Sequence, residues 1–281
     1  MARLSPRVRR APYTFNWLRT HAELSALVEH CQAVIGRTCD PATPPADALR
    51  TTPTRISAGS SGSYHVRAAD GTVVGIFKPR DEEPYAPHNP KWAKRAQRLL
   101  CPCLFGRPYL HPGGGYVSEA AASIVDAFLG LDVVPRTTVA FLSSPVFSYP
   151  LWQRVAAWQA ALRDDDADPE DATGYPPKAG SFQLYVRGFL HSDEGVARLR
   201  RLQAEGTCPA LADAFHAEFE RMVVLDYVIR NTDRTMDNWL LHVSIDADGV
   251  NSVDSGVIPR RIGAASVAVG LGAARTDTES P

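Results

Sequence analysis

The segment RNTDRTMDNW, residues 230–239, places charged and amide side chains between two apolar stretches. It follows FERMVVLDYVI and precedes LLHVSI, so both flanks have the composition of buried elements. Within the segment, Asn238 follows Asp233 in the pattern D-x-x-x-x-N. In phosphoryl transfer of the kinase type, one loop carries an Asp beside the attacking hydroxyl and, further along, an Asn that binds the metal. The spacing points to that chemistry, although alone it matches many chains by chance.

Three further features agree with phosphoryl transfer. Lys78 lies in the apolar stretch VVGIFKP, a predicted strand from which a lysine can reach nucleotide phosphates. Upstream, the segment GSSGSY contains Ser61, Gly62 and Ser63, and its backbone amides could fold over phosphates. Downstream, Asp254 lies in VDSG, where a kinase-like fold has its second Mg²⁺-binding carboxylate.

Each feature also has an ordinary structural explanation. Lys78 could lie at a strand edge, the glycines and Asp254 could form plain turns, and Asp233 with Asp237 could cap a helix. Taken singly, each structural explanation is the better one. The order of these features along the chain, and the predicted elements that carry them, favour kinase-like ATP chemistry.

Periodicity predicts the elements that must position these residues. Helices are expected at 21–36, 116–131, with Ser118 as N-cap, and 211–229. Strands are expected at 63–68, 72–79, 133–142 and 181–190, the first two joined by the turn Asp70-Gly71, with a second hairpin over 240–256. Prolines in 37–54 predict an interruption of regular structure, and the acidic segment 163–177 a surface loop.

This order of elements predicts two lobes joined near GSFQLYV, residues 180–186. Residues 1–55 are expected to be a mostly flexible extension. Residues 56–180 form the first lobe, with the Gly/Ser-rich loop, the lysine and a cysteine-rich segment. Residues 181–256 form a partial second lobe, and 257–281 a disordered tail.

Composition excludes some functions. The 281 residues carry 30 Lys and Arg against 31 Asp and Glu, which argues against a nucleic-acid binder. No apolar run is long enough to cross a bilayer, and the arginine-rich start lacks the apolar core of a secretory signal. Five cysteines without regular disulfide spacing indicate a reduced protein facing the cytosol.

Several stretches resemble type II phosphatidylinositol 4-kinases, apparently of the fungal kind. They include SSGSYHV, VVGIFKPRDEEPYAPHNPKW, CPCLFGRPYL, GYVSEAAASIVD and FERMVVLDYVIRNTDRTMDNWL. The resemblance implies an α+β, two-lobed, protein-kinase-like fold of the phosphatidylinositol 3-/4-kinase type. It also implies ATP and Mg²⁺ as cofactors, and transfer of the ATP γ-phosphate to the 4-hydroxyl of phosphatidylinositol.

By position, the resemblance assigns the ATP phosphates to Lys78, with Ser61, Gly62 and Ser63 above them. Glu119 is the candidate for an ion pair with Lys78.

The resemblance implies that the joint contacts adenine, largely through backbone groups. It also implies that the polar loop is the catalytic loop. The joint residues are Gln183, Leu184, Tyr185 and Val186. Asp233 is the expected catalytic aspartate, with Asn238 and Asp254 as metal ligands.

The segment KRAQRLLCPCLFGRPYL resembles the family's palmitoylation motif through Cys101 and Cys103. Two acyl chains hold a protein stably on a membrane, whereas one binds only marginally. The alternatives are a buried thiol pair or half a zinc site, and the absence of a second nearby pair makes zinc a poor fit. A peripheral protein on the cytosolic face of a Golgi, endosomal, vacuolar or plasma membrane is expected, with phosphatidylinositol and ATP as partners and no nucleic acid.

Two departures from the family pattern limit this expectation. The family usually has Gly-Asn at Thr235-Met236, and Asp-Asn-Gly where this chain has Asp254-Ser255-Gly256. After Gly256 the sequence resembles nothing in the family, which predicts an incomplete, truncated or divergent second lobe. Two hypotheses follow: an active lipid kinase, or an inactive remnant that serves as a nucleotide-binding or membrane-associated scaffold.

Overall fold

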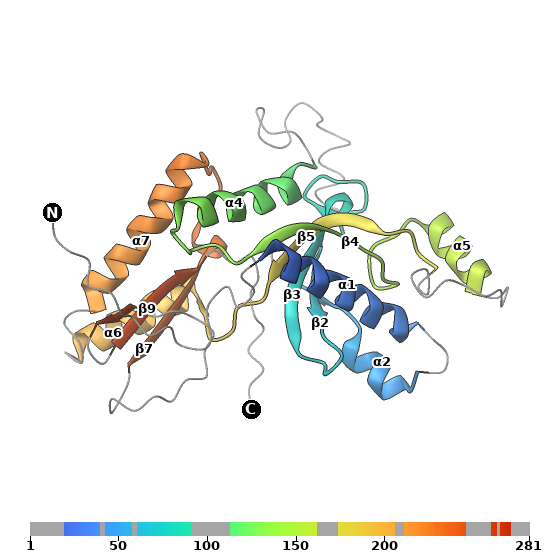
Figure 1. The fold of residues 1–281 in the computed structure, drawn as a ribbon, viewed down its shortest axis with the longest axis horizontal. Coiled ribbons are helices and arrows are strands. Elements are labelled where there is room, and N and C mark those ends of the chain that lie inside the picture. The colour runs from blue at the N-terminus through green and yellow to red at the C-terminus, as the bar shows by residue number, and fades with distance from the viewer. Residues whose placement is uncertain are drawn as a thin grey trace. The chain divides into compact units, whose positions relative to one another are not determined.

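The computed structural model describes most of the chain, which divides into two compact units (Figure 1). The described residues are 20–39, 43–57, 61–90, 113–161, 174–205, 211–245, 260–262 and 265–270. Of these, the N-terminal unit comprises residues 20–125 and 136–185. The C-terminal unit comprises residues 126–135 and those from 186 onward.

A five-stranded antiparallel sheet in the order β1-β2-β3-β5-β4 forms the centre of the N-terminal unit. Its strands are β1 (Thr54–Ile56), β2 (Ser63–Arg67), β3 (Val73–Pro79), β4 (Thr137–Leu142) and β5 (Lys178–Leu184). The middle strand β3 carries Lys78, which lies opposite Ser181 of β5. Phe77 and Phe182, both fully buried, pack in the core of this sheet. The strand that presents the lysine is therefore held on both sides.

The predicted hairpin is confirmed, because β2 and β3 pair in antiparallel register. Asp70 and Gly71 form its turn: Gly71 has φ +85°, a conformation that glycine adopts without strain. The Thr72 N–H donates to Asp70 Oδ1 at 2.9 Å, which closes the turn.

The predicted first helix is confirmed as α1 (His21–Thr38). It begins with a capping box, in which Thr20 and Glu23 each accept a hydrogen bond from the other's backbone N–H. It lies against the sheet, in contact with β2 and β4 (Figure 1), and the Gln32 amide bonds Ser143 through both of its polar atoms. Prediction of a flexible extension up to residue 55 is thus wrong for α1, whose buried face belongs to the core.

A second short helix, α2 (Pro45–Thr51), interrupts the segment that was expected to lack regular structure. Pro45 occupies its first turn, where a backbone N–H has no helical partner and the proline φ angle suits the helix. The prolines of 37–54 were therefore misread: one of them starts a helix.

The third helix of this unit, α4 (Gly115–Leu129), confirms the predicted helix but not its cap. Ser118 lies inside the first turn, and its Oγ donates to the Gly114 carbonyl at 3.1 Å. The helix ends at Gly130, which has φ +64° and so suits a helix C-terminus. A further helix, α5 (Leu151–Ala161), precedes the acidic segment, of which residues 163–173 lie outside the described part.

The predicted strand over 181–190 is shorter than expected. β5 ends at Leu184, and the chain bends at Gly188, which has φ +77°. The next strand, β6 (Leu190–His191), pairs with a strand of the C-terminal unit. The glycine therefore separates two strands that apolar composition alone reads as one.

Two helices and a four-stranded sheet make up most of the C-terminal unit. They are α6 (Ser192–Ala204), α7 (Leu211–Val228), β6, β7 (Leu240–Ile245), β8 (Arg260–Ile262) and β9 (Ala265–Gly270). The sheet order is β6-β7-β9-β8, and Figure 1 shows α6 and α7 beside β7 and β9. A buried cluster joins the helices to β7 through Leu199, Met222, Trp239 and Leu241. The helix α7 was predicted, whereas the charged α6 was not.

The prediction of a disordered tail over 257–281 is wrong for β8 and β9. All six residues of β9 pair with β7 in antiparallel register, and β9 also pairs with β8. The sequence ASVAVG alternates β-branched and small residues, which a sheet accommodates even though its hydrophobicity is modest. Residues 246–259, where the second predicted hairpin was placed, lie outside the described part; among the described strands, β7 pairs with β6 and β9.

Acidification is expected to destabilise the C-terminal unit through His242 of β7. Burial lowers the pKa of His242 below its ordinary 6.5, and Arg198 adds to this, although the hydrogen bond to the Gly188 carbonyl at 2.7 Å opposes it. The unfolded chain therefore binds the proton more readily, so stability is present above pH 6.5 and declines as the pH falls below it. Denaturant unfolding between about pH 8 and about pH 5.5 should show this decline, and His242→Asn should flatten it. An unchanged slope in the variant would contradict the assignment to His242.

Candidate functional site

Lys78 forms an ion pair with Glu119 inside the N-terminal unit. Its Nζ lies 2.6 Å from Glu119 Oε1, and only 10% of the lysine side chain is exposed. The other oxygen, Glu119 Oε2, accepts a hydrogen bond from Ser181 Oγ at 2.6 Å. Because Ser181 lies opposite Lys78 on the neighbouring strand, the carboxylate is held by two adjacent strands. The predicted ion pair is confirmed, and it fixes the ammonium group of Lys78 in one place.

The helix that carries Glu119 is capped by a residue from the β3 side of the unit. Glu83 accepts hydrogen bonds from the backbone N–H groups of Tyr116 at 2.7 Å and Gly115 at 3.2 Å. A carboxylate at a helix N-terminus satisfies unpaired N–H groups and complements the helix dipole. Burial raises the pKa of Glu83, while these two N–H groups act in the opposite direction. Glu83, and not the predicted Ser118, thus caps α4. By fixing the start of the helix it also fixes the position of Glu119.

The Gly/Ser-rich loop is described from Ser61 onward. Ser63 is buried at the start of β2, opposite Ile56, and Ser61 is half-buried. The Gly62 N–H donates to the Glu82 carbonyl at 2.9 Å. The loop therefore enters β2 in a fixed conformation, beside the strand that carries Lys78.

The predicted adenine joint has most of its amides already paired. The Leu184 N–H donates to the Arg136 carbonyl at 2.9 Å, and the Tyr185 N–H to the Val74 carbonyl at 3.0 Å. The buried Gln183 side chain donates to Thr137 Oγ1 at 3.3 Å. Among the described residues, the Val186 N–H makes no hydrogen bond, so it is the backbone donor that the joint can offer to a ligand.

The polar loop RNTDRTMDNW lies in the C-terminal unit, between α7 and β7. It contains the 3-10 turn η3 (Met236–Asn238), after which Trp239 enters the buried cluster. The Asn238 amide nitrogen donates to the Asp233 carbonyl and lies 3.3 Å from Asp233 Oδ2. The two residues of the D-x-x-x-x-N pattern are therefore in contact, and the Asp233 side chain is exposed at the surface of the loop.

Two residues that sequence reasoning missed brace this loop: Asp226 of α7 and Arg234. Both Asp226 oxygens accept from Arg234, from Nη2 and from Nε, each at 2.7 Å. Asp226 Oδ1 also accepts from the Asn231 amide at 2.8 Å, and Arg234 Nη1 donates to the Asn238 carbonyl at 2.7 Å. A bidentate arginine–carboxylate pair is geometrically rigid. The brace therefore links the end of α7 to the loop that carries Asp233 and Asn238.

Replacing Arg234 by Met is expected to lower the free energy of unfolding by about 2 kcal/mol, because it leaves the half-buried Asp226 without its main partner. Arg200→Met, at an exposed position of α6, is the matched control. Equal thermal unfolding midpoints for the two variants would contradict the brace.

Other predicted site residues lie outside the described part of the chain. These are Asp254, the metal ligand, and the cysteines Cys101 and Cys103; the Asp237 side chain is also not described. Within the described ranges, no group of three or more His, Cys, Asp or Glu side chains could hold a metal ion. The loop departure at Thr235-Met236 is accommodated at the surface, because the Met236 side chain is 49% exposed and its carbonyl accepts from Ser192 Oγ.

The profile of one protein family, described as phosphatidylinositol 3- and 4-kinase, matches residues 60–258. That range contains the Gly/Ser-rich loop, Lys78, Glu119 and the Asp233–Asn238 pattern. The chain belongs to the phosphatidylinositol 3- and 4-kinase family. Its fold is accordingly the α+β, kinase-like fold of that family, as the resemblance implied.

Relatives within the family are similar along most of this chain. Phosphatidylinositol 4-kinase type 2-beta of Gallus gallus is 44% identical over 209 residues, and type 2-alpha of Danio rerio is 45% identical over 207. These alignments cover 73% and 72% of this chain, but 43% and 46% of the relatives. The chain thus spans less than half the length of these type II kinases. The expected resemblance to fungal members of the family stays a prediction.

Proposed function

We propose that the protein transfers the γ-phosphate of ATP to the 4-hydroxyl of phosphatidylinositol. The observation that carries the proposal is that two pairs of side chains lie in contact inside the range of the family match. Lys78 is ion-paired with Glu119, and Asp233 is in contact with Asn238. The relatives' names supply the lipid and the position of the phosphate. An inactive remnant is the alternative, and nothing in either arrangement favours it.

In this reaction the 4-hydroxyl oxygen attacks the γ-phosphorus. A new oxygen–phosphorus bond forms, the bond from the γ-phosphorus to the β–γ bridging oxygen breaks, and ADP leaves. Asp233, exposed on its loop, accepts the hydroxyl proton. Lys78 holds the phosphates, and Glu119 keeps its ammonium group in place.

The residues also fit a divalent cation of the Mg²⁺ type. Asn238 donates through its nitrogen to Asp233, so its amide oxygen is the atom left for a metal, and hard oxygen ligands are what Mg²⁺ prefers. Asp254 is proposed as the second ligand. When bound, the cation would neutralise charge on the phosphates.

Adenine is proposed to bind at the joint through backbone groups of Gln183, Leu184, Tyr185 and Val186. Because the amides of Leu184 and Tyr185 are used within the sheet, the donor to the base would be the Val186 N–H. The Gln183 side chain is turned into the unit, toward Thr137, so it supports the joint.

The test is a transfer assay with purified protein, ATP, Mg²⁺ and phosphatidylinositol in detergent micelles. Phosphorylated lipid should appear with the unaltered chain and not with Asp233→Ala. Lipid product no greater than that of Asp233→Ala would overturn the proposal and favour the inactive scaffold.

Membrane attachment is proposed to rely on acylation of Cys101 and Cys103. None of the described helices is both long and apolar enough to cross a bilayer. Replacing both cysteines by Ser should move most of the protein from membrane to soluble fractions, because two acyl chains are needed for stable anchoring. Replacing Cys31, a buried thiol of α1, is the control for general damage. Unchanged partitioning of the double variant would count against the anchor, which is proposed for the cytosolic face.

A further inference from the structure

Three consecutive carboxylates follow the lysine strand, and each is hydrogen-bonded or ion-paired. They are Asp81, Glu82 and Glu83, the first two in the 3-10 turn η1 (Arg80–Glu82) directly after β3. Glu83 caps α4, as described above. Asp81 accepts from His88 at 2.8 Å and from Lys178 at 2.9 Å. None of the roles proposed so far uses the middle residue, Glu82.

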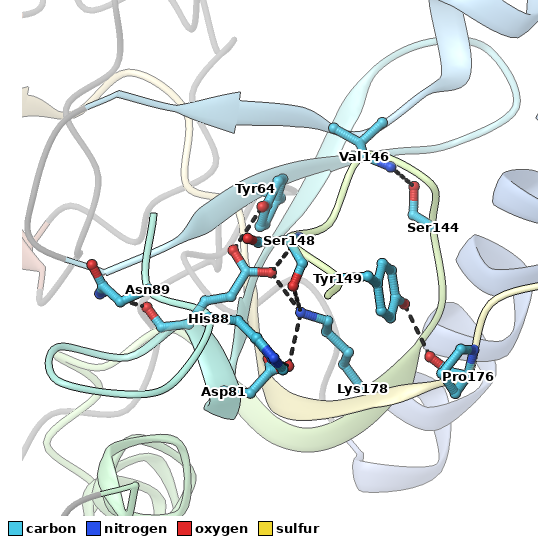
Figure 2. Close-up of polar contacts among 11 residues, drawn as sticks. Tyr64, Asp81, His88, Asn89, Ser144, Val146, Ser148, Tyr149, Pro176 and Lys178 are labelled. Carbon is cyan, nitrogen blue, oxygen red and sulfur yellow. Dashed lines mark hydrogen bonds and ion pairs between the residues drawn. The ribbon is translucent and has the colours of Figure 1, made fainter. Parts of the chain in front are cut away.

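Glu82 is completely buried, and both oxygens of its carboxylate accept hydrogen bonds. Oε2 accepts from the Tyr64 hydroxyl at 2.7 Å, and Oε1 accepts from Lys178 Nζ at 2.9 Å and the Ser148 N–H at 2.8 Å. Figure 2 shows the Lys178 side chain between Asp81, Ser148 and Tyr149, and its ammonium lies 4.5 Å from the centre of the Tyr149 ring. Burying a carboxylate is costly unless it is paired and hydrogen-bonded, and here both conditions are met. The side chain is therefore fixed in one orientation.

The Gly/Ser-rich loop lies directly on this fixed carboxylate. The Gly62 N–H donates to the Glu82 carbonyl at 2.9 Å. A Cβ added to Gly62 would lie 2.3 Å from Glu82 Oε2 and 2.8 Å from Glu82 Cβ, closer than non-bonded atoms approach. A glycine is needed at this position because the carboxylate cannot move away from its three donors.

We propose that Glu82 is a positioning residue for phosphate binding, which sets the Gly/Ser-rich loop at a fixed place relative to Lys78. Lys78 and the residue that contacts the Gly/Ser-rich loop belong to the same short stretch of chain. Lys78 is the penultimate residue of β3, and Glu82, four residues later, accepts a hydrogen bond from the Gly62 N–H through its backbone carbonyl. The buried pair Glu82–Lys178 ties that stretch to β5. This inference rests on the proposed function, because the phosphate role of the loop and of Lys78 is itself proposed.

The inference makes a prediction that general damage to the fold does not. A loop displaced from the phosphates should weaken ATP binding and leave adenosine binding intact, because adenosine has no phosphates. Loss of packing alone should weaken both ligands together. The ratio of the two affinities therefore separates positioning from stability.

The experiment measures dissociation constants for ATP with Mg²⁺ and for adenosine by calorimetry, using the full chain. Gly62→Ala and Glu82→Gln are expected to weaken ATP binding about 10- to 100-fold, because the loss of a hydrogen bond to a charged group costs about that much. Adenosine binding should stay within about twofold. His88→Gln, which alters the Asp81 side of the same cluster without touching Gly62, should change neither constant. If Glu82→Gln fails to fold, Gly62→Ala decides alone, since it leaves the buried pair intact.

Some results would contradict the positioning role of Glu82 or the phosphate site on which it depends. Equal loss of ATP and adenosine affinity in Gly62→Ala, or an unchanged ATP affinity in a folded variant, overturns the positioning role of Glu82. If the unaltered chain binds ATP no more tightly than adenosine, the proposed phosphate site itself fails, whatever the variants do.

Discussion

Asp233→Asn is expected to lower kcat for lipid phosphorylation by about 10²- to 10⁴-fold, the usual contribution of a positioned general base. Asparagine keeps the shape of the side chain and can still contact Asn238, but it cannot accept the proton of the attacking hydroxyl. The KM for ATP should change little, because Asp233 is proposed to act on the hydroxyl and not on the nucleotide.

The control for this variant is Asp213→Asn, a neutralised carboxylate at an exposed position of α7 in the same unit. It should retain full turnover and the same thermal unfolding midpoint. A kcat for Asp233→Asn within about tenfold of the unaltered chain would contradict the assignment of Asp233 as the base.

Lys78→Met is expected to lower kcat/KM for ATP by about 10²- to 10³-fold, because a buried ammonium aimed at the phosphates is worth far more than one in water. Glu119→Gln should give a smaller loss in the same direction. The glutamine amide can still contact Lys78 and Ser181, but it does not balance the charge of Lys78. That charge matters because only 10% of the Lys78 side chain is exposed. Steady-state kinetics at varied ATP measure both effects.

Glu29→Gln serves as the control for charge, because Glu29 is exposed on α1 in the same unit. It should leave kcat/KM for ATP unchanged. If Glu119→Gln behaves as this control does, the ion pair has no part in holding Lys78 for the nucleotide.

The parts of the fold that the sequence predicted depend on short-range patterns. The β2–β3 hairpin follows from alternation and from the turn Asp70-Gly71, and α1 and α7 follow from helical spacing of apolar residues. The Asp233–Asn238 contact lies within one loop, over the short spacing of the D-x-x-x-x-N pattern. Such features can be predicted because the residues that form them are close together in the sequence.

The parts that the sequence did not reveal are contacts between distant residues. Glu82 and Lys178 are 96 positions apart, and Glu83 caps a helix 33 positions away, so no local signal marks either pair. Asp226 and Arg234 are only eight positions apart, and the available signal was an acidic residue near the end of the predicted helix with an arginine inside the following loop. The strand β9 was missed because its small residues resemble those of a disordered tail.

The family includes kinases that act at different positions of the inositol ring, as its description as phosphatidylinositol 3- and 4-kinase states. The most direct measurement is therefore the position of the phosphate transferred from ATP labelled at the γ-phosphorus to phosphatidylinositol, after deacylation and chromatography against standards. The predicted result is a labelled 4-phosphate that disappears with Asp233→Asn. A labelled 3-phosphate, or a 4-phosphate that persists with Asp233→Asn, would contradict the proposed function.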